Sequence, residues 1–262
     1  NLDDCIRVTK NVDIVINAAG MVSAVQMTVN NPMSAISTNL IITLRILEAC
    51  MISNPKKVLL FSSGTTGYPG TSKKMIEPDM FKEEPADIYY GYGWSRRYTE
   101  ILGKFVSMKT NIDISICRPS AVYGIYDDFD PNTSHVIPAL IKRAVDDENP
   151  YIVWGTGKEK RDFIYIEDLV KGCLNQICFT KGYDVSNICY GESVSISEVV
   201  YNIFDILKKS KNKIFFDKDK PTTIPIRRLS NNKAKRELDF IPKYPIHRGL
   251  KKTIKWYIKN YV

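Results

Sequence analysis

The sequence predicts an α/β protein in which helices cover both faces of a doubly wound parallel sheet, with a smaller α/β lobe toward the C-terminus. Short apolar runs alternate with segments of helical spacing, as in β-α-β units. The 262 residues are 44% hydrophobic, enough for one large core or for a large domain and a small lobe. No uninterrupted apolar run reaches the ~18 residues of a membrane-spanning helix, so we expect a globular protein without a membrane partner.

The first part of the chain predicts three buried strands separated by long helices. The runs Val12–Ala19 (VDIVINAA), Lys57–Phe61 (KVLLF) and Ile112–Cys117 are short and apolar, as buried parallel strands are. Apolar residues at helical spacing predict helices over residues 32–53 and 92–110. Shorter elements follow residue 125: helices at 134–145, 167–177, 195–208, 231–238 and 248–261, and strands at 151–154, 163–165, 187–190 and 213–216.

Positive charge is concentrated toward the C-terminus. The chain has 37 basic and 29 acidic residues, and residues 207–262 alone hold 17 basic against 4 acidic ones. The lysines follow a helical pattern, and no nucleic-acid recognition motif accompanies them. We therefore expect a solvated lysine-rich face and no nucleic-acid partner.

The cysteines and the first residues bear on the compartment. The six cysteines show neither CxxC spacing nor a compact framework, and most have apolar neighbours. They predict reduced core thiols, and no metal site is predicted. Asn1 is followed by Asp3 and Asp4, without the basic and apolar regions of a signal peptide. We expect a cytoplasmic protein.

A glycine motif after the second strand matches a dinucleotide-binding turn in spacing only. Gly64, Gly67 and Gly70 recur every three residues. A phosphate-binding turn of this kind opens a helix whose N-terminus faces the pyrophosphate. Here Pro69 lies inside the motif, and the segment Thr71–Met80 (TSKKMIEPDM) has no amphipathic period. The motif therefore predicts a turn.

A tyrosine and an arginine at the start of the second long helix form the most informative candidate site. Tyr92 and Arg96 share one helix face, and a nearby cation favours the tyrosinate form, which suits a general acid and base. The hydroxyl-rich run SSGTT at 62–66 ends the neighbouring strand and can hydrogen-bond the same substrate oxygen. Together these groups suit oxidation of a carbinol or reduction of a ketone.

Several longer motifs occur together in order: DIVINAAG, FSSGTTGYP, YGWSRRYTE, RPSAVYG, DDFDPNTSHVIPALIKR, WGTGKEKRDFIYIEDL and PIRRLSNNKAKRELDFIPKYPIHRGLKKTIKWY. Through them the chain resembles the extended short-chain dehydrogenase/reductases of the NAD-dependent epimerase/dehydratase family, and among these the GDP-L-fucose synthases. The resemblance covers nearly the whole chain. It implies a Rossmann-like doubly wound fold, NAD or NADP as cofactor and a nucleotide-diphosphate sugar as substrate.

The resemblance assigns a catalytic centre. Tyr92 matches the family's catalytic tyrosine, and Arg96 stands where the family normally has a lysine that donates to the nicotinamide ribose; arginine keeps the charge but is larger and planar. The usual catalytic Ser or Thr falls on Gly64, so the hydroxyl must come from Ser63 or Thr65. The implied cofactor-binding residues are Ala18, Ala19, Gly20, Ser62, Ser63, Tyr92, Arg96 and Pro119.

Two further positions bear on the reaction. His135 lies in the stretch that matches the proton donor of the fucose synthases, and imidazole titrates near neutral pH. The cysteine that these enzymes use in the other epimerisation step aligns with Thr66, whose hydroxyl is a poor acid. We therefore expect a 4-keto reduction, or an epimerisation through a 4-keto sugar, which needs only the tyrosine centre.

The substrate-binding residues are implied by the same resemblance. Arg143, Trp154 and Arg161 match positions that hold the nucleotide diphosphate. Guanidinium groups bind phosphate oxygens in pairs, and aromatic rings pack against the sugar or base. Arg227 and the adjacent Arg228 are further candidates.

The resemblance also bears on domain organisation. Val12–Ala19 corresponds to the family's fourth strand, so about fifty or more earlier residues with the GxxGxxG turn are expected before it, and the chain is expected to be N-terminally truncated. NAD and NADP stay open, because the discriminating residue lies in that part. We expect a partial dinucleotide-binding domain at 1–124, a mainly substrate-binding lobe at 125–262 that interleaves with it, and a homodimer through the helices at 31–53 and 92–110.

Two functions follow as alternatives. The first is an NAD(P)-dependent nucleotide-sugar epimerase or reductase. The second is a catalytically weak nucleotide-sugar-binding homologue, because Arg96 and Gly64 depart from the family pattern.

Overall fold

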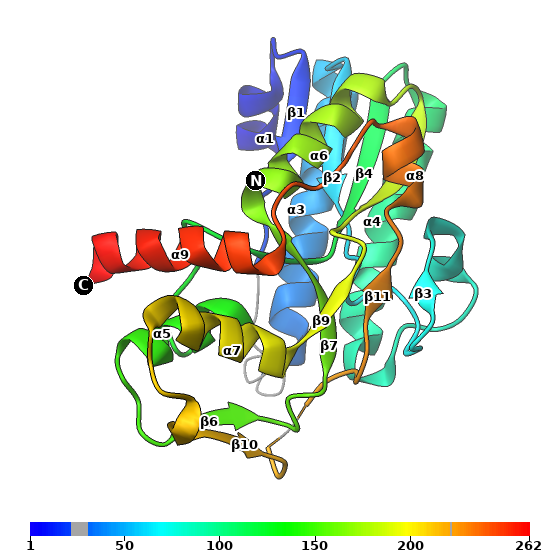
Figure 1. Cartoon of the computed structure of the whole chain (residues 1–262). Coiled ribbons are helices and arrows are strands. Elements are labelled where there is room, and N and C mark those ends of the chain that lie inside the picture. The colour runs from blue at the N-terminus through cyan, green and yellow to red at the C-terminus, as the bar shows by residue number, and fades with distance from the viewer. Residues whose placement is uncertain (22–30, 221) are drawn as a thin grey trace.

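The centre of the molecule is a four-stranded parallel sheet. The structure is a computed structural model of the chain, and it describes residues 1–21, 31–220 and 222–262. The strand order is β1-β2-β4-β8, and every pair is parallel (Figure 1). The predicted α/β class and parallel sheet are confirmed. The four strands span Ile14–Asn17 (β1), Lys57–Phe61 (β2), Asp113–Pro119 (β4) and Tyr183–Ile188 (β8).

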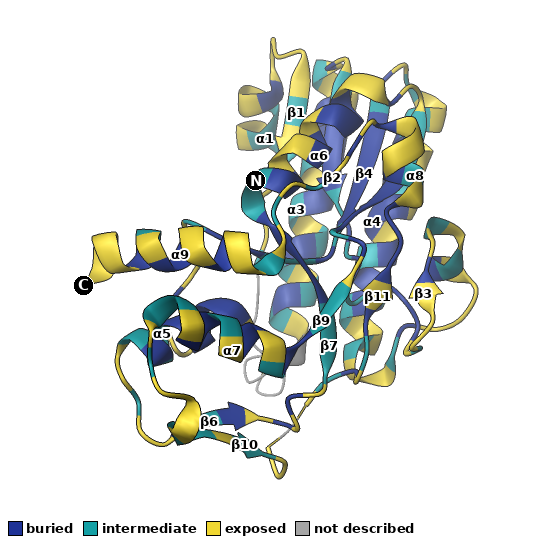
Figure 2. Ribbon diagram, viewed as in Figure 1, coloured by how far each residue is buried: buried dark blue, intermediate teal, exposed yellow. Residues whose placement is uncertain are grey.

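Helices cover both faces of this sheet, as predicted. Successive side chains of a strand point to opposite faces, so Val58 and Leu60 pack toward α3 and α4 while Leu59 packs toward α6 and α8. Figure 2 shows β2 and β4 buried along most of their length. The helices span Pro32–Ser53 (α3), Tyr90–Lys109 (α4), Ile166–Phe179 (α6) and Asn232–Glu237 (α8).

A second buried core lies among three further helices, α5, α7 and α9. Its side chains are largely aliphatic and aromatic, and the rings of Tyr151 and Phe204 meet edge to face with 4.9 Å between centroids. The strands β5, β7 and β9 form one short sheet, and β6 and β10 form a parallel pair. The elements span Val136–Val145 (α5), Ile196–Leu207 (α7), Ile246–Tyr261 (α9), Ala121–Tyr123 (β5), Tyr151–Trp154 (β6), Lys160–Tyr165 (β7), Ser193–Ser195 (β9) and Ile214–Asp217 (β10).

The structure adds elements that the sequence patterns did not predict. The helix α1 (Leu2–Thr9) packs on α3. The strand β8 begins ahead of the predicted start at residue 187, because its polar residues are buried through hydrogen bonds rather than through apolar character. The remaining short elements are β3 (Lys74–Met75), β11 (Arg228–Leu229) and the 3-10 turns η1 (Glu77–Phe81), η2 (Asp87–Tyr89) and η3 (Lys211–Lys213).

Two apolar surfaces lie on the outside of this fold. Val15 packs on the α3 side, so Ile14 and Ile16 of the edge strand β1 point to the other face, where they are 47% and 48% exposed. Met33–Ser53 in α3 is long and apolar enough to cross a membrane by length and composition alone. In the fold this helix buries Leu47 against the sheet and leaves an apolar outer face.

Candidate functional site

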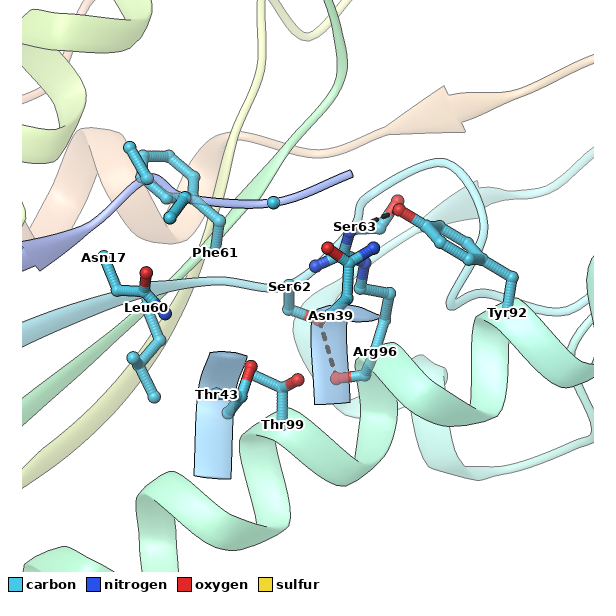
Figure 3. A pocket seen from close by; sticks show the side chains of 13 residues that line it. Asn17, Asn39, Thr43, Leu60, Phe61, Ser62, Ser63, Tyr92, Arg96 and Thr99 are labelled. Atoms are coloured by element: carbon cyan, nitrogen blue, oxygen red, sulfur yellow. Dashed lines mark hydrogen bonds between the residues drawn. The ribbon is translucent and has the colours of Figure 1, made fainter. Parts of the chain in front are cut away.

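A cavity of about 190 Å³ lies at the carboxyl ends of β1 and β2. This is the edge at which open parallel sheets bind their ligands. Its walls come from the segments that follow these two strands and from inward-facing residues of α3 and α4 (Figure 3). The described residues that line it are Asn17, Ala18, Ala19, Gly20, Asn39, Thr43, Leu60, Phe61, Ser62, Ser63, Tyr92, Arg96 and Thr99.

The helix α4 presents Tyr92 and Arg96 to this cavity from successive turns. The Arg96 guanidinium donates a hydrogen bond to the Tyr92 hydroxyl, and its central carbon lies 4.8 Å from the centre of the Tyr92 ring. Ser62 Oγ donates to the Arg96 carbonyl at 3.3 Å and so ties this part of the helix to the end of β2. A phenol, a cation and a strand terminus thus meet in one place.

Ser63 lines the cavity, whereas Thr65 lies outside the lining. Ser63 Oγ accepts hydrogen bonds from the backbone N–H groups of Thr65 and Thr66, at 3.2 and 3.1 Å. These two bonds hold the Ser63 side chain in place. Of the two hydroxyls that the sequence left open, Ser63 is the one that shares the cavity with Tyr92.

Packing explains why glycine stands at position 64. A Cβ at Gly64 would lie 2.6 Å from Leu229 Cδ1 and 2.7 Å from the carbonyl oxygen of Pro119, so Ser or Thr does not fit. Pro119 itself lies at the end of β4, outside the cavity lining. The segment that contains Gly64, Gly67 and Gly70 forms turns without a following helix, which confirms that prediction.

Small residues form the wall at the end of β1. Ala18, Ala19 and Gly20 line the cavity, as expected, and a Cβ on Gly20 would lie 3.0 Å from Asn39 Oδ1. Asn39 also accepts from the Met21 N–H at 2.7 Å and donates to the Met21 carbonyl at 2.9 Å, and so holds this segment against α3. The sequence reasoning missed the lining residues Asn17, Asn39, Thr43 and Thr99. The signal that could have found Asn39 and Thr43 is their spacing: both are polar, they lie one helical turn apart, and both are buried in the structure.

Three other predicted residues lie outside the cavity. His135 precedes α5 and is exposed, and its charge lowers the pKa of Asp128, although the hydrogen bond from Thr133 lowers that pKa more. The Arg143 guanidinium bonds Glu148 at 2.7 Å and the carbonyl of Ile152 at 2.6 Å. Trp154 ends β6 with 52% of its surface exposed.

Arg161 and Arg227 lie side by side on adjacent strands. Lys160 and Ile226 form an isolated parallel bridge, and each arginine is the next residue along its segment; the Arg227 N–H also donates to the Lys160 carbonyl at 2.9 Å. Arg227 is 2% exposed, and burial lowers its pKa to about 10, with the Arg161 charge as a further cause. Burial also lowers the pKa of Arg161.

The hydrogen bonds of this arginine pair go to uncharged acceptors. Arg227 donates to the carbonyl of Pro69 at 2.7 Å, and its Nε is buried without a partner. Arg161 donates to Thr223 Oγ1 at 2.6 Å and to the carbonyl of Lys160 at 2.8 Å. Within the described part of the chain, neither guanidinium forms an ion pair with a carboxylate. Two adjacent cations, one of them buried, with no direct carboxylate contact favour an anionic ligand, although the Glu159 charge acts on Arg161 from nearby.

The cavity lies at the carboxyl edge of a parallel sheet, and its wall holds a tyrosine and a cation one helical turn apart. This arrangement agrees with the class of extended short-chain dehydrogenase/reductases. The chain belongs to the NAD dependent epimerase/dehydratase family, whose sequence pattern matches residues 1–189. It is therefore an enzyme of a nicotinamide-dependent family.

Named relatives and solved structures agree with this assignment. The chain is 27% identical over 259 residues to probable GDP-L-fucose synthase 1 of Oryza sativa, which covers 95% of this chain and 76% of that protein. It is 28% identical to GDP-L-colitose synthase of Yersinia pseudotuberculosis, with 95% and 82% covered. Its fold matches UDP-glucose 4-epimerase of Thermotoga maritima with a TM-score of 0.89 and 22% identity, over 100% of this chain and 83% of that one.

The cavity fits the nicotinamide and ribose end of a dinucleotide. Ala18, Ala19 and Gly20 leave space at the end of β1, and Tyr92 and Arg96 supply polar groups across it. A bound nicotinamide would supply or accept a hydride at this place.

Proposed function

We propose that the protein is an NAD(P)-dependent epimerase or 4-keto reductase of nucleotide-diphosphate sugars. The observation that carries this proposal is the contact between Tyr92 and Arg96 inside the cavity at the sheet edge. This contact supports the proposal because it gives a phenol, with a cation on its oxygen, for proton transfer in the cavity that we assign to the cofactor. Ser63 adds a hydroxyl to the same cavity.

The chemistry follows from these three side chains. Oxidation of a sugar hydroxyl removes a proton from oxygen and a hydride from carbon, and Tyr92 accepts the proton. In the reduction of a ketone, Tyr92 returns a proton to the oxygen that receives the new electron pair. Arg96 holds the Tyr92 hydroxyl, and Ser63 binds the same substrate oxygen.

The arginine pair supports a diphosphate substrate. Arg161 and Arg227 carry guanidinium groups, which suit phosphate oxygens, and Arg161 is the more accessible of the two. A relative at 27% identity, from Streptomyces, is named dTDP-4-dehydro-6-deoxy-D-allose reductase, a name that joins a nucleotide diphosphate to a 4-keto sugar. His135 stays our candidate for a proton donor, and Arg143 and Trp154 stay our candidates for holding the nucleotide diphosphate, although none of the three lines the cavity.

We also propose a homodimer in a reducing compartment, the cytoplasm. The outer faces of α3 and α4 expose large apolar side chains, among them Ile41 at 57%, Leu44 at 44%, Ile101 at 47% and Phe105 at 50%. Pairing these faces between two copies would remove this surface from water. All six cysteines are free thiols, which supports the compartment.

A hydride-transfer assay tests the proposed reaction. The enzyme is mixed with NADH or NADPH and a 4-keto-6-deoxy nucleotide sugar, and the loss of reduced nicotinamide is followed by absorbance. Turnover that needs both partners supports the proposal. Sugar binding without turnover would support the alternative, a nucleotide-sugar-binding homologue, which the replacement of the family's lysine by Arg96 favours.

A further inference from the structure

Arg97 is a buried cation on α4 that bonds to both ends of a long loop. Its side chain is packed inside the protein, and the residue is 1% exposed. The Nε group donates to the Gly67 carbonyl at 2.9 Å, and the Nη2 group donates to the Glu83 carbonyl at 2.6 Å. One guanidinium therefore holds two loop positions, far apart in the sequence, against the helix that carries Tyr92.

The surroundings of Arg97 explain why an arginine stands there. Its hydrogen bonds go to backbone carbonyls, and its central carbon lies 4.8 Å from the centre of the Trp94 ring. Burial lowers the pKa of Arg97, although the charges of Glu84 and Glu100 act on it from nearby. A buried charge costs free energy that an apolar side chain would not cost. A planar fork of donors, however, reaches both carbonyls at once.

The Gly67 end of the loop belongs to the turn that carries Ser63. A Cβ on Gly67 would lie 3.0 Å from the Ser63 carbonyl oxygen, so the two residues pack closely. The same turn meets α4 at Gly93, where an added Cβ would lie 2.5 Å from the Thr66 carbonyl oxygen. Ser63 Oγ accepts from the Thr66 N–H at 3.1 Å. The bond from Arg97 to Gly67 therefore closes a short connection between Ser63 and the helix.

We propose that Arg97 is a positioning residue, whose bond to Gly67 fixes the turn that carries Ser63 at a set distance from Tyr92. This inference rests on the proposed function. Arg97 lies outside the cavity lining, whereas Ser63 and Tyr92 both line the cavity. Arg97 thus acts on the reaction only through the placement of Ser63. Such placement matters because a shift of about 1 Å in a reacting group can lower the rate about 10²-fold.

A double-mutant cycle with Ser63→Ala tests the effect on the reaction. Arg97→Met removes both hydrogen bonds, and we expect kcat to fall about tenfold to a hundredfold. In the Ser63→Ala background the same substitution should change kcat less than about twofold, because the group that Arg97 positions is already absent. Arg236→Met is the control, since the Arg236 side chain on α8 is 68% exposed, and it should leave kcat within about twofold. Equal losses in the two backgrounds would overturn the role through Ser63.

Hydrogen exchange tests the placement without turnover. The N–H groups of Thr65 and Thr66 bond to Ser63 Oγ, so we expect Arg97→Met to speed exchange at residues 62–67 about tenfold, with exchange in β2 unchanged. Arg97→Lys keeps the charge without the fork and should give a smaller increase. It also serves if Arg97→Met does not fold, which thermal melting shows.

The two measurements separate this inference from the proposed function. Unchanged exchange at residues 62–67 in both Arg97 variants would overturn the inference. Faster exchange in Arg97→Met, together with an unmodified protein that turns over none of the nucleotide sugars, would keep the role of Arg97 in the turn and overturn the proposed function.

Discussion

Arg118 on β4 donates two hydrogen bonds to the carboxylate of Glu100 on α4, at 2.8 and 2.6 Å. Both side chains are almost fully buried, at 3% and 2% exposure. The pair joins the helix that carries Tyr92 to the central sheet. Arg118 also donates to the Tyr68 hydroxyl at 2.9 Å, so the ion pair belongs to a larger buried network.

Loss of the Glu100 charge should destabilise the protein strongly. Glu100→Gln leaves the Arg118 guanidinium buried without its counter-charge, and we expect the free energy of unfolding to fall by about 3–5 kcal/mol. Urea denaturation measures this change. Asp146→Asn is the control, because it breaks the exposed Lys142–Asp146 pair and should cost less than about 1 kcal/mol. Equal losses in the two variants would contradict the structural role of Glu100.

Removal of the Tyr92 hydroxyl should abolish most of the turnover. Tyr92→Phe deletes the proton-transfer group and keeps the ring, so kcat should fall by about 10²–10⁴ while nucleotide-sugar affinity stays nearly unchanged. Steady-state kinetics and calorimetry measure the two quantities. Tyr98→Phe serves as the control, since Tyr98 lies on the same helix and is 46% exposed. A loss below about tenfold at Tyr92 would assign this side chain to packing alone.

Asp162 should make the stability pH-dependent. Its carboxylate accepts from the N–H groups of Tyr190 at 3.0 Å and Gly191 at 2.8 Å, yet burial raises its pKa to about 6. The unfolded chain has an aspartate pKa of about 3.9, so the folded state holds this proton more tightly. The stabilisation is therefore full below about pH 4 and is lost as the pH rises through 6, a change of about 3 kcal/mol.

Asp162→Asn provides the measurement. The asparagine does not titrate, so the unfolding free energy of the original protein minus that of the variant should fall by about 3 kcal/mol from pH 4 to pH 7. Other titrating groups cancel in this difference. A difference that is constant with pH would show that Asp162 ionises as it does in an unfolded chain.

A charge on the outer face of α4 should prevent dimer formation. Phe105→Glu places a carboxylate within the proposed apolar interface, and we expect sedimentation analysis to find a monomer. Phe179→Glu on α6 changes a side chain of similar exposure, 55% against 50%, on another surface, and should leave the dimer intact. A dimer that survives Phe105→Glu would locate the interface elsewhere.

We expect Thr66 to limit the stereochemistry of the proposed reaction. The resemblance aligns it with a cysteine of the fucose synthases, and a hydroxyl is a much weaker acid than a thiol. With a 4-keto-6-deoxy nucleotide sugar in deuterated water, we expect mass spectrometry to find deuterium at no more than one of the two carbons that flank the ketone. Deuterium at both carbons would mean that another residue supplies the second acid.

The sequence predicted correctly those elements whose structure depends on residues close together in the chain. The run KVLLF became β2 with the predicted boundaries, and the spacing of Tyr92 and Arg96 became a contact, because strand alternation and helical pitch act over a few residues. The β8 strand was predicted at residues 187–190, and its first part, Tyr183–Ser186, was missed because the polar Asp184 there is held by Lys233, far along the chain. Polar burial of this kind depends on long-range partners.

In the candidate site, too, some features followed from neighbouring residues and others depended on residues far along the chain. The residues after β1 and β2 were predicted to face the cofactor, and the structure places both segments in one cavity, because parallel strands end at the same edge of a sheet. The choice between Ser63 and Thr65 depended on which of them lines the folded cavity. The glycine at position 64 depends on Leu229, which closes the space there from far along the chain.

The two hydrogen bonds that Ser63 Oγ accepts from backbone N–H groups decide whether its hydroxyl can donate to a ligand or accept from it. An oxygen of this kind has two lone pairs, and the N–H groups of Thr65 and Thr66 occupy both of them. The only polar capacity that remains is the hydroxyl proton, so Ser63 can act toward a bound molecule solely as a donor. It can stabilise a carbonyl or an alkoxide oxygen, but it cannot receive the proton of an alcohol. That acceptor role is left to Tyr92.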